Sequence, residues 1–471
     1  MDTNLMGIGE LSGTIGGRHI SFTSNCGFSS VAIDSRCVNE GALFFALAGS
    51  SLDGHGFVED AFKKGAKAAV VSLLGHEKFN LSDIARKMEK DLIIVNDTLK
   101  ALQDSARAYI ERFKNIIKVG ITGSSGKTTT KEIAAAIISC DKNTVMNKGN
   151  FNSETGLPLS VFEVRDCHEV GIFELGMNRP GEISEIAEVL KPNIALVTNI
   201  GSAHIEYFGS KAKIVDEKKC IFNFLNDDDI ALIPQNDEFK NELSQGVKGK
   251  IKYYDAGFFS ELEGTRSLGL EGTEILWDGE KIHFALPGKH SLEDAMAAIA
   301  IAKEIPVKKS AIKQGLESVK PLFGRLEILK GRTTVVRDCY NANPQSCEKA
   351  IEFCDSVDWP ARKIYVIADM LELGEASFCE HKNIGSILAS SKADKVFLFG
   401  NEIKAAADCM TDNKKDYFYT DKIDVLYSQL NCYAKEGDLV LLKGSRGCAL
   451  ERLSGMLTGT DEENAGFTGV N

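Results

Sequence analysis

The chain has 471 residues, of which 43% are hydrophobic and 26% are charged. This length exceeds what one hydrophobic core usually serves and predicts about three domains. The formal net charge is −12 and no long basic run is present, so we expect no nucleic acid or anionic membrane as a partner. An anionic ligand must then be held by local Lys and Arg side chains and by backbone N–H groups.

The amino terminus and the cysteines indicate the compartment. The opening stretch MDTNLMGIGELSGTIGG has an acidic second residue and no apolar core of signal-peptide length, and no later apolar run approaches 18 residues. The twelve cysteines include no C-x-x-C pair, which argues against a zinc ribbon or a disulfide framework. We therefore expect a cytoplasmic protein with reduced thiols and without membrane insertion.

Short apolar runs alternate with helical patterns almost throughout, which predicts α/β layers. Residues 1–110 read as a small α/β domain, and a helix at 98–114 leads out of it. Residues 111–322 continue with strands at 116–123, 169–177 and 193–201, a doubly wound pattern. Residues 323–471 form a third unit, with further strands separated by helical stretches at 363–370, 395–400 and 438–446.

The stretch ITGSSGKTTT at 121–130 lies between an apolar strand and a helical segment. Its glycines, Gly123 and Gly126, allow turns that point N–H groups at phosphate oxygens, and the next helix adds its positive end. Lys127 supplies a mobile cation, and Thr128 or Thr129 offers a hydroxyl to Mg²⁺. The strict phosphate-loop pattern fails because Ile121 replaces its first glycine. We still favour a nucleotide site, which includes Ser124 and Ser125, over a plain glycine turn.

Polar residues follow the strands of the middle unit, and ligands of open parallel sheets bind beyond those carboxyl ends. Glu174 closes one strand and can serve as a magnesium carboxylate. His204 follows the next strand, although a lone histidine is more often a packing residue. Asn150 lies in a turn-rich segment, where asparagine and glycine could serve turn formation alone.

The string RDCYNANPQS in the third unit brings Asp338, Asn341 and Asn343 into one turn-rich loop. Turn formation alone could explain it. Loops of this composition after strands are also where α/β proteins place binding groups.

Eight strings in order together resemble the Mur ligases, over most of the chain. These strings are GSSGKTTT, FELGMNRPGEI, TNIGSAHIEYFG, LPGKHSLEDAMAAIA, FGRLEI, YNANPQS, DMLELGE and LLKGSR. The resemblance implies that residues 1–110 bind the UDP part of a substrate and that residues 111–322 bind ATP. It implies a Rossmann-like domain at 323–471 that holds an incoming amino compound and completes the ATP site.

The resemblance also implies a reaction in peptidoglycan precursor synthesis. ATP phosphorylates the terminal carboxylate of a UDP-N-acetylmuramoyl-tripeptide, and the amine of D-alanyl-D-alanine attacks the acyl phosphate. Mg²⁺ accompanies ATP, and we expect a monomer. Such catalysis is chiefly positioning and charge neutralisation.

Residue roles follow by matching positions. Lys127 neutralises the β- and γ-phosphates, Asn150 helps to set the nucleotide and the substrate carboxylate, and Thr128, Glu174, His204 and a carbamylated Lys218 surround the magnesium. Ser35 and Arg36 face the UDP substrate. From the third domain, Arg325, Asp338 and Asn341 complete the ATP site, while Asn341 and Asn343 approach the dipeptide.

Two departures from the family pattern stand out. Members usually carry asparagines in the helix where this chain has Ser291 and Asp294, although His290 is retained, so the adenine contacts of His290 and Asp294 stay open. The string VDEKKCIF also differs from the usual one, so Lys219 competes with Lys218 as the modified lysine.

Two other functions remain open at this point. One is another amide ligase of the same superfamily, adding the third stem residue or glutamates to folate, although such relatives usually lack the YNANP string. The other is a nucleotide-dependent switch, which would leave the third domain without a role.

Overall fold

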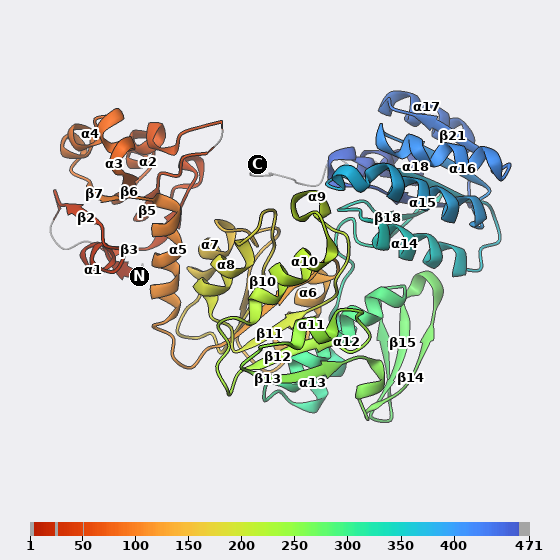
Figure 1. Cartoon of the computed structure of the whole chain (residues 1–471), viewed down its shortest axis with the longest axis horizontal. Helices are drawn as coiled ribbons and strands as arrows, with labels where there is room; N and C mark the ends of the chain where they lie inside the picture. The colour runs from red at the N-terminus through yellow and green to blue at the C-terminus, as the bar shows by residue number, and fades with distance from the viewer. Residues whose placement is uncertain (1–3, 24–26, 50, 461–471) are drawn as a thin grey trace.

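The computed structural model describes residues 4–23, 27–49 and 51–460, and these form three α/β units in chain order (Figure 1). Each unit is built around its own mainly parallel sheet, as the alternation of apolar runs and helical patterns predicts. The three-domain α/β fold class is therefore confirmed. The exact boundaries near residues 110 and 322 stay predictions.

The N-terminal unit is a five-stranded sheet in the order β2-β7-β6-β5-β4, with β2 antiparallel to β7 and the other pairs parallel. Its strands are β2 (Arg18–Ile20), β4 (Ser30–Ala32), β5 (Ala42–Phe45), β6 (Ala68–Ser72) and β7 (Asp91–Val95), and β1 (Met6–Gly7) pairs with β3 (Gly27–Phe28) beside them. Its helices are α1 (Ile8–Thr14), α2 (Val58–Lys63), α3 (Leu73–Lys78) and α4 (Leu81–Met88).

Helix α5 (Thr98–Ile110) joins this unit to the middle one. Asp97 caps its start by accepting hydrogen bonds from the backbone N–H groups of Leu99 and Lys100. Its buried face packs into one apolar core that the two units share, so the junction is a packed interface.

The middle unit contains a six-stranded, all-parallel sheet in the order β13-β12-β11-β8-β10-β9. Its strands are β8 (Ile117–Thr122), β9 (Thr144–Met146), β10 (Val170–Glu174), β11 (Ile194–Val197), β12 (Ile230–Pro234) and β13 (Lys250–Tyr254). Its helices are α6 (Lys127–Ile138), α7 (Gly156–Val161), α8 (Glu182–Leu190), α9 (Ile205–Phe208), α10 (Lys211–Lys219), α11 (Lys240–Ser244), α12 (Lys289–Lys303) and α13 (Lys309–Ser318). The order reverses around β8, so the loop after β8 opens at a switch point of the sheet.

A three-stranded antiparallel sheet interrupts the alternation that the sequence predicts. It consists of β14 (Leu262–Ser267), β15 (Thr273–Trp277) and β16 (Glu280–Phe284). Asp278 and Gly279 form the turn between β15 and β16, both with positive φ. An Asp-Gly pair between apolar runs is a hairpin signal, which could have revealed this sheet.

The C-terminal unit is a six-stranded sheet in the order β17-β18-β22-β19-β20-β21, with only β17 antiparallel. Its strands are β17 (Glu327–Lys330), β18 (Thr334–Asp338), β19 (Lys363–Ala368), β20 (Lys395–Phe399), β21 (Tyr417–Thr420) and β22 (Leu439–Lys443). Its helices are α14 (Pro344–Ser356), α15 (Ser377–Ser390), α16 (Ala407–Asp412), α17 (Ile423–Tyr433) and α18 (Ser454–Thr458).

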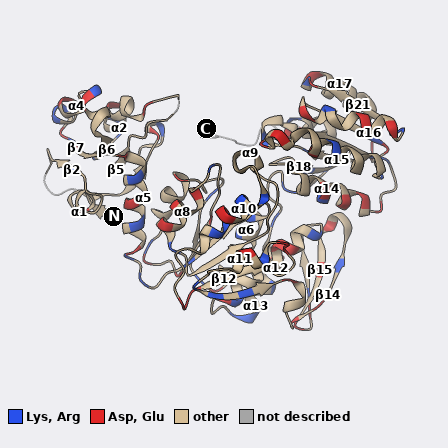
Figure 2. Cartoon of the chain, in the orientation of Figure 1, with Lys and Arg blue, Asp and Glu red and all other residues tan. Residues whose placement is uncertain are grey.

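Charged residues of both signs are distributed over all three units (Figure 2). Among the residues described, we find no helix whose length and apolar character would let it cross a membrane.

Candidate active site

A cavity of about 720 Å³ lies between the middle and C-terminal units. Most of the residues singled out from the sequence lie on its wall, although they come from segments far apart in the chain. These residues are Ser124, Ser125, Gly126, Lys127, Thr128, Thr129, Asn150, Glu174, His204, Lys218, His290, Asp294, Arg325, Asp338, Asn341 and Asn343. The carboxyl ends of β8, β10 and β11 therefore meet the loops of the C-terminal sheet.

The phosphate loop connects β8 to α6 in a backbone path that only glycine allows. Gly123 and Gly126 have φ angles of 151° and 79°. A Cβ on Gly123 would overlap Thr198, and one on Gly126 would overlap Asp294. Thr198 also donates to the Ser125 carbonyl (2.6 Å), while the Asn199 side chain accepts from the Ser125 N–H (3.1 Å). The strand-end residues Thr198 and Asn199 thus brace the loop.

Glu174 is the centre of a polar cluster at the end of β10. Its Oε2 accepts a hydrogen bond from the Thr128 hydroxyl (2.7 Å), and its Oε1 accepts one from the Asn152 amide (2.7 Å). Arg325 donates to the same Thr128 hydroxyl (2.9 Å), and its guanidinium lies 4.2 Å from the centre of the Tyr340 ring. Glu174 is only 2% exposed, so a carboxylate is held in place by polar neighbours, not by solvent.

Lys127 and Lys218 meet at one backbone carbonyl. The amino groups of Lys127 and Lys218 lie 2.7 and 3.0 Å from the oxygen of Gly123. Burial, offset in part by Glu174, lowers the pKa of Lys127. Burial and the charge of Lys127 lower the pKa of Lys218 well below its usual value. Lys127 is thus held against the main chain, unlike the free cation that the sequence suggested.

Lys218 and Lys219 lie in different surroundings. Lys218 is 1% exposed and lies on the cavity wall, whereas Lys219 is half-buried at the end of α10 and is absent from the described wall residues. The structure therefore brings Lys218 to the site.

The C-terminal wall contains a buried cation that sequence reasoning missed. Lys443, at the end of β22, is 2% exposed and forms an ion pair with Asp338 at the end of β18 (2.8 Å). Its amino group also donates to the Asn341 carbonyl (2.9 Å). Its place at a central strand end, in the string LLKGSR, was the available signal.

Asn343 has a local structural role in addition to its place on the wall. Its side chain accepts from the backbone N–H of Ser346 (2.9 Å) and so caps the start of α14. Asn150 also lies on the cavity wall and is exposed.

Two titratable residues of α12 lie beside the phosphate loop. Burial lowers the pKa of His290 to about 4. Burial raises the pKa of Asp294 well above its usual value, with a further contribution from Glu293. The Thr130 hydroxyl donates a hydrogen bond to Asp294 Oδ1 at 3.5 Å, which opposes the effect of burial in part.

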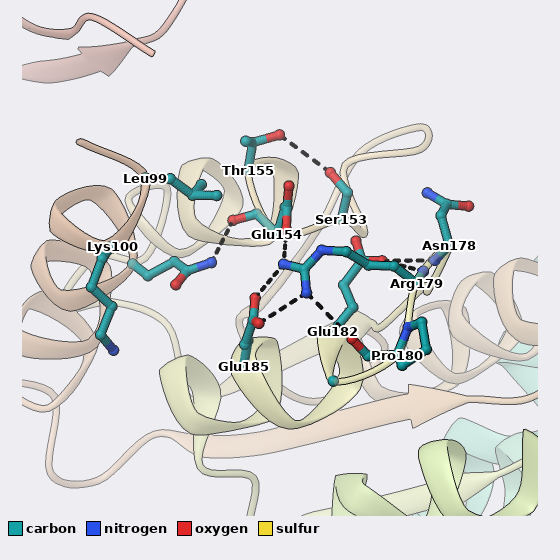
Figure 3. Close-up of polar contacts among 12 residues, drawn as sticks. Leu99, Lys100, Ser153, Glu154, Thr155, Asn178, Arg179, Pro180, Glu182 and Glu185 are labelled. Carbon is teal, nitrogen blue, oxygen red and sulfur yellow. Dashed lines mark hydrogen bonds and ion pairs between the residues drawn. The ribbon is translucent and has the colours of Figure 1, made fainter. Parts of the chain in front are cut away.

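A second polar cluster lies close to α5, beside the cavity residues Ser153 and Asn178 (Figure 3). The guanidinium of Arg179 lies between Glu154 and Glu185, 2.6 Å from the latter. Glu182 accepts from the backbone N–H groups of Asn178 (2.7 Å) and Arg179 (3.3 Å). The sequence analysis assigned no site role to these residues. Only Glu154 comes from a more distant segment, 25 residues from Arg179, and reaches it through packing.

Ser35 and Arg36 lie far from this cavity, in the N-terminal unit. They belong to a short 3₁₀ turn, η1 (Ser35–Cys37), and Arg36 forms an ion pair with Asp34 at 2.6 Å. The Arg36 side chain is 74% exposed. The structure therefore does not bring this pair together with the other predicted site residues.

The donor set of the cavity fits a magnesium ion that travels with a nucleotide. In the part of the chain that the structure describes, no three His, Cys, Asp or Glu residues form a ready-made metal cage. Glu174 and Thr128 nevertheless place two oxygen donors 2.7 Å apart beside the phosphate loop. Mg²⁺ is typically bound by one or two protein oxygens together with phosphates and water.

Three stretches of the chain match the sequence patterns of Mur ligase domains. Residues 28–110 match the Mur ligase family catalytic domain, 121–302 the Mur ligase middle domain, and 324–446 the Mur ligase glutamate ligase domain.

Similar proteins extend this match to nearly the whole chain. The UDP-N-acetylmuramoyl-tripeptide–D-alanyl-D-alanine ligase of Treponema pallidum is 40% identical over 92% of this chain and 94% of its own length. The protein of that name from Bacillus subtilis is 33% identical over 90% and 92%.

Two solved structures share this fold. MurF from Acinetobacter baumannii aligns with a TM-score of 0.84 and 28% identity, covering 97% of this chain and 100% of that one. MurF ligase from Thermotoga maritima, solved with ADP, aligns with a TM-score of 0.77 and 27% identity over 91% and 97%. Given these similarities and the cavity described above, the chain belongs to the Mur ligase family.

Proposed function

We propose that this protein uses ATP to join D-alanyl-D-alanine to a UDP-N-acetylmuramoyl-tripeptide, a step of peptidoglycan precursor synthesis. One observation carries the proposal: a single cavity combines the phosphate loop and Glu174 with Arg325, Asp338 and Asn341 from the C-terminal side. A relative of that name at 40% identity supports the choice of substrates.

The reaction needs two bond exchanges. The terminal carboxylate of the tripeptide bonds to the γ-phosphorus of ATP as the bond to ADP breaks. The amine of the dipeptide then bonds to the acyl carbon, phosphate leaves, and the nitrogen loses a proton. Lys127 and Arg325 stabilise the negative charge of the phosphoryl group in transfer, and the loop N–H groups orient it.

Mg²⁺ belongs to the proposal as the partner of ATP. Thr128 and Glu174 would hold it, with His204 nearby, and it would neutralise charge on the phosphates. As a protonated ammonium, Lys218 could not be a metal ligand, and Mg²⁺ prefers oxygen to an amine nitrogen.

We extend the proposal to a carbamate at Lys218. Its burial and its lowered pKa favour the neutral amine, which is the form that reacts with CO₂. The carbamate would be an oxygen anion beside Lys127, so that repulsion between two amines becomes attraction.

The test is a mass measurement on the product. Purified protein is incubated with ATP, Mg²⁺, D-alanyl-D-alanine and tripeptides that differ in the third residue. We expect the mass of the tripeptide plus the dipeptide minus water, with one ADP formed per product. ADP formation without any carboxylate substrate would instead support a switch protein, and a product formed only with a single amino acid would support another amide ligase.

A further inference from the structure

The loop after β11 is held by the C-terminal unit. The backbone N–H of Glu206 donates to the carbonyl of Glu372 (3.3 Å), and the N–H of Ser202 donates to the side chain of Gln345 (3.3 Å). Helix α9 thereby packs against η6 (Gly374–Ala376) of the C-terminal unit, and Figure 1 shows α9 on the side that faces this unit. The segment 201–208 is therefore an interface between the two units.

Two residues with unusual backbones meet in this interface. His204 Nδ1 lies 2.7 Å from Glu372 Oε2. Both residues adopt left-handed backbone conformations, with φ of 63° and 64°. Non-glycine residues in this region cost roughly 1–3 kcal/mol each and cluster at functional sites.

Stability alone does not account for this pair. The Glu372 side chain is 42% exposed, and ion pairs at such sites contribute about 0–1 kcal/mol, less than the backbone strain. The His204 side chain is 16% exposed and lines the cavity, whereas Glu372 lies outside the described residues of the wall. The carboxylate therefore acts on the ring, not on a ligand.

The chemistry of imidazole indicates what the carboxylate does. A carboxylate at one ring nitrogen fixes the tautomer and the orientation of the ring, and leaves the other nitrogen for a ligand. Contact at Nδ1 leaves Nε2 of His204 for the cavity.

We propose that Glu372 is a positioning residue that the C-terminal unit supplies to the middle unit. It holds His204 so that Nε2 is presented to the metal ion and the terminal phosphate. The middle-unit half of the site is thus complete only while the C-terminal unit is docked. This inference rests on the proposed function for its ligands, but the contact itself exists without them.

The first test uses the protein without ligands. Hydrogen exchange of residues 201–208 is compared between wild type, Glu372→Gln and the control Glu375→Gln, whose exposed carboxylate lies three residues away. We expect faster exchange in 201–208 for Glu372→Gln only, with an unchanged Tm. Exchange equal to wild type would overturn the proposal.

The second test uses the loaded enzyme. We expect Glu372→Gln to lower kcat roughly 10- to 100-fold and to raise the Mg²⁺ concentration for half-maximal activity, with little change in KM for the tripeptide substrate. Glu372→Asp should recover part of the loss, and Glu375→Gln should match wild type. In the double variant with His204→Ala, removing Glu372 should cost nothing further, whereas additive losses would overturn the proposal. If wild type ligates no tripeptide, the proposed function fails, and the hydrogen-exchange test still decides the contact.

Discussion

The phosphate loop is predicted to bind ATP and the Ser35–Arg36 turn to face the UDP substrate, and the two differ in how many contacts hold their side chains. The phosphate-loop side is enclosed, and its side chains hold each other through Glu174, Asn199 and the Gly123 carbonyl. Arg36 has one ion pair, with its neighbour Asp34, and is mostly exposed. The side chains of the phosphate-loop end are therefore held by one another, whereas we expect those of the Ser35–Arg36 end to be organised by the substrate or by movement of the N-terminal unit.

Removing Lys127 should give the largest loss of activity, because the phosphate-loop end of the site depends on its charge. Lys127→Ala should lower kcat/KM by roughly 10³-fold or more while the fold is kept. Steady-state kinetics and circular dichroism check this. A folded variant with near-normal turnover would contradict the assignment of the phosphate loop.

Lys218→Ala should come next, since the carbamate proposal places an anion there. We expect a loss of roughly 10²- to 10³-fold, partly recovered by a short-chain carboxylate such as acetate. Lys219→Ala is the matched control on the same helix and should behave nearly like wild type. Full activity of Lys218→Ala would remove the carbamate from the mechanism.

At the Ser35–Arg36 turn, Arg36→Ala should raise KM for the UDP substrate about 10-fold, as expected for one charge-assisted hydrogen bond. KM for ATP should stay constant, because the turn lies apart from the cavity. Arg86→Ala removes an equally exposed arginine of the same unit, in an ion pair with Asp83, and serves as the control. An equal change in both KM values would mean that the two ends are not independent.

The smallest expected effect concerns protein stability and involves Asp294, beside the phosphate loop. Because burial raises the pKa of Asp294, its favourable contribution is complete below the unfolded pKa near 4 and is lost as pH rises through the folded pKa. Asp294→Asn should therefore raise Tm by roughly 2–4 °C at pH 8 and leave it unchanged near pH 4. Calorimetry at both pH values measures this. A lower Tm at pH 8 would show that the carboxylate is charged and paired.

The sequence predicts the conformation of the phosphate loop well, because the residues that determine it are neighbours in the chain. Glycine at 123 and 126, the adjacent lysine and the apolar strand before them specify a loop whatever surrounds it. Glu174 and His204 were predicted because Glu174 ends one buried strand of a parallel sheet and His204 follows another, and such strand ends converge.

The missed residues depend on partners from distant segments. Lys443 matters because β22 lies beside β18, and Glu372 matters because two units dock. The choice between Lys218 and Lys219 likewise depends on which side of α10 is buried. Tertiary packing determines which of these residues meet, and the residues next to them in the sequence do not indicate it.

The carbonyl of Gly123, shared by Lys127 and Lys218, has a consequence for the charges inside the site. Burial, and after it the charge of Lys127, lowers the pKa of Lys218 and favours its uncharged form at this shared oxygen. On the carbamate proposal, CO₂ bonds to that uncharged amine, and a phosphate nearby would favour the protonated form instead. The carbamate would then replace the meeting of two lysine side chains at one carbonyl with an ion pair inside the site.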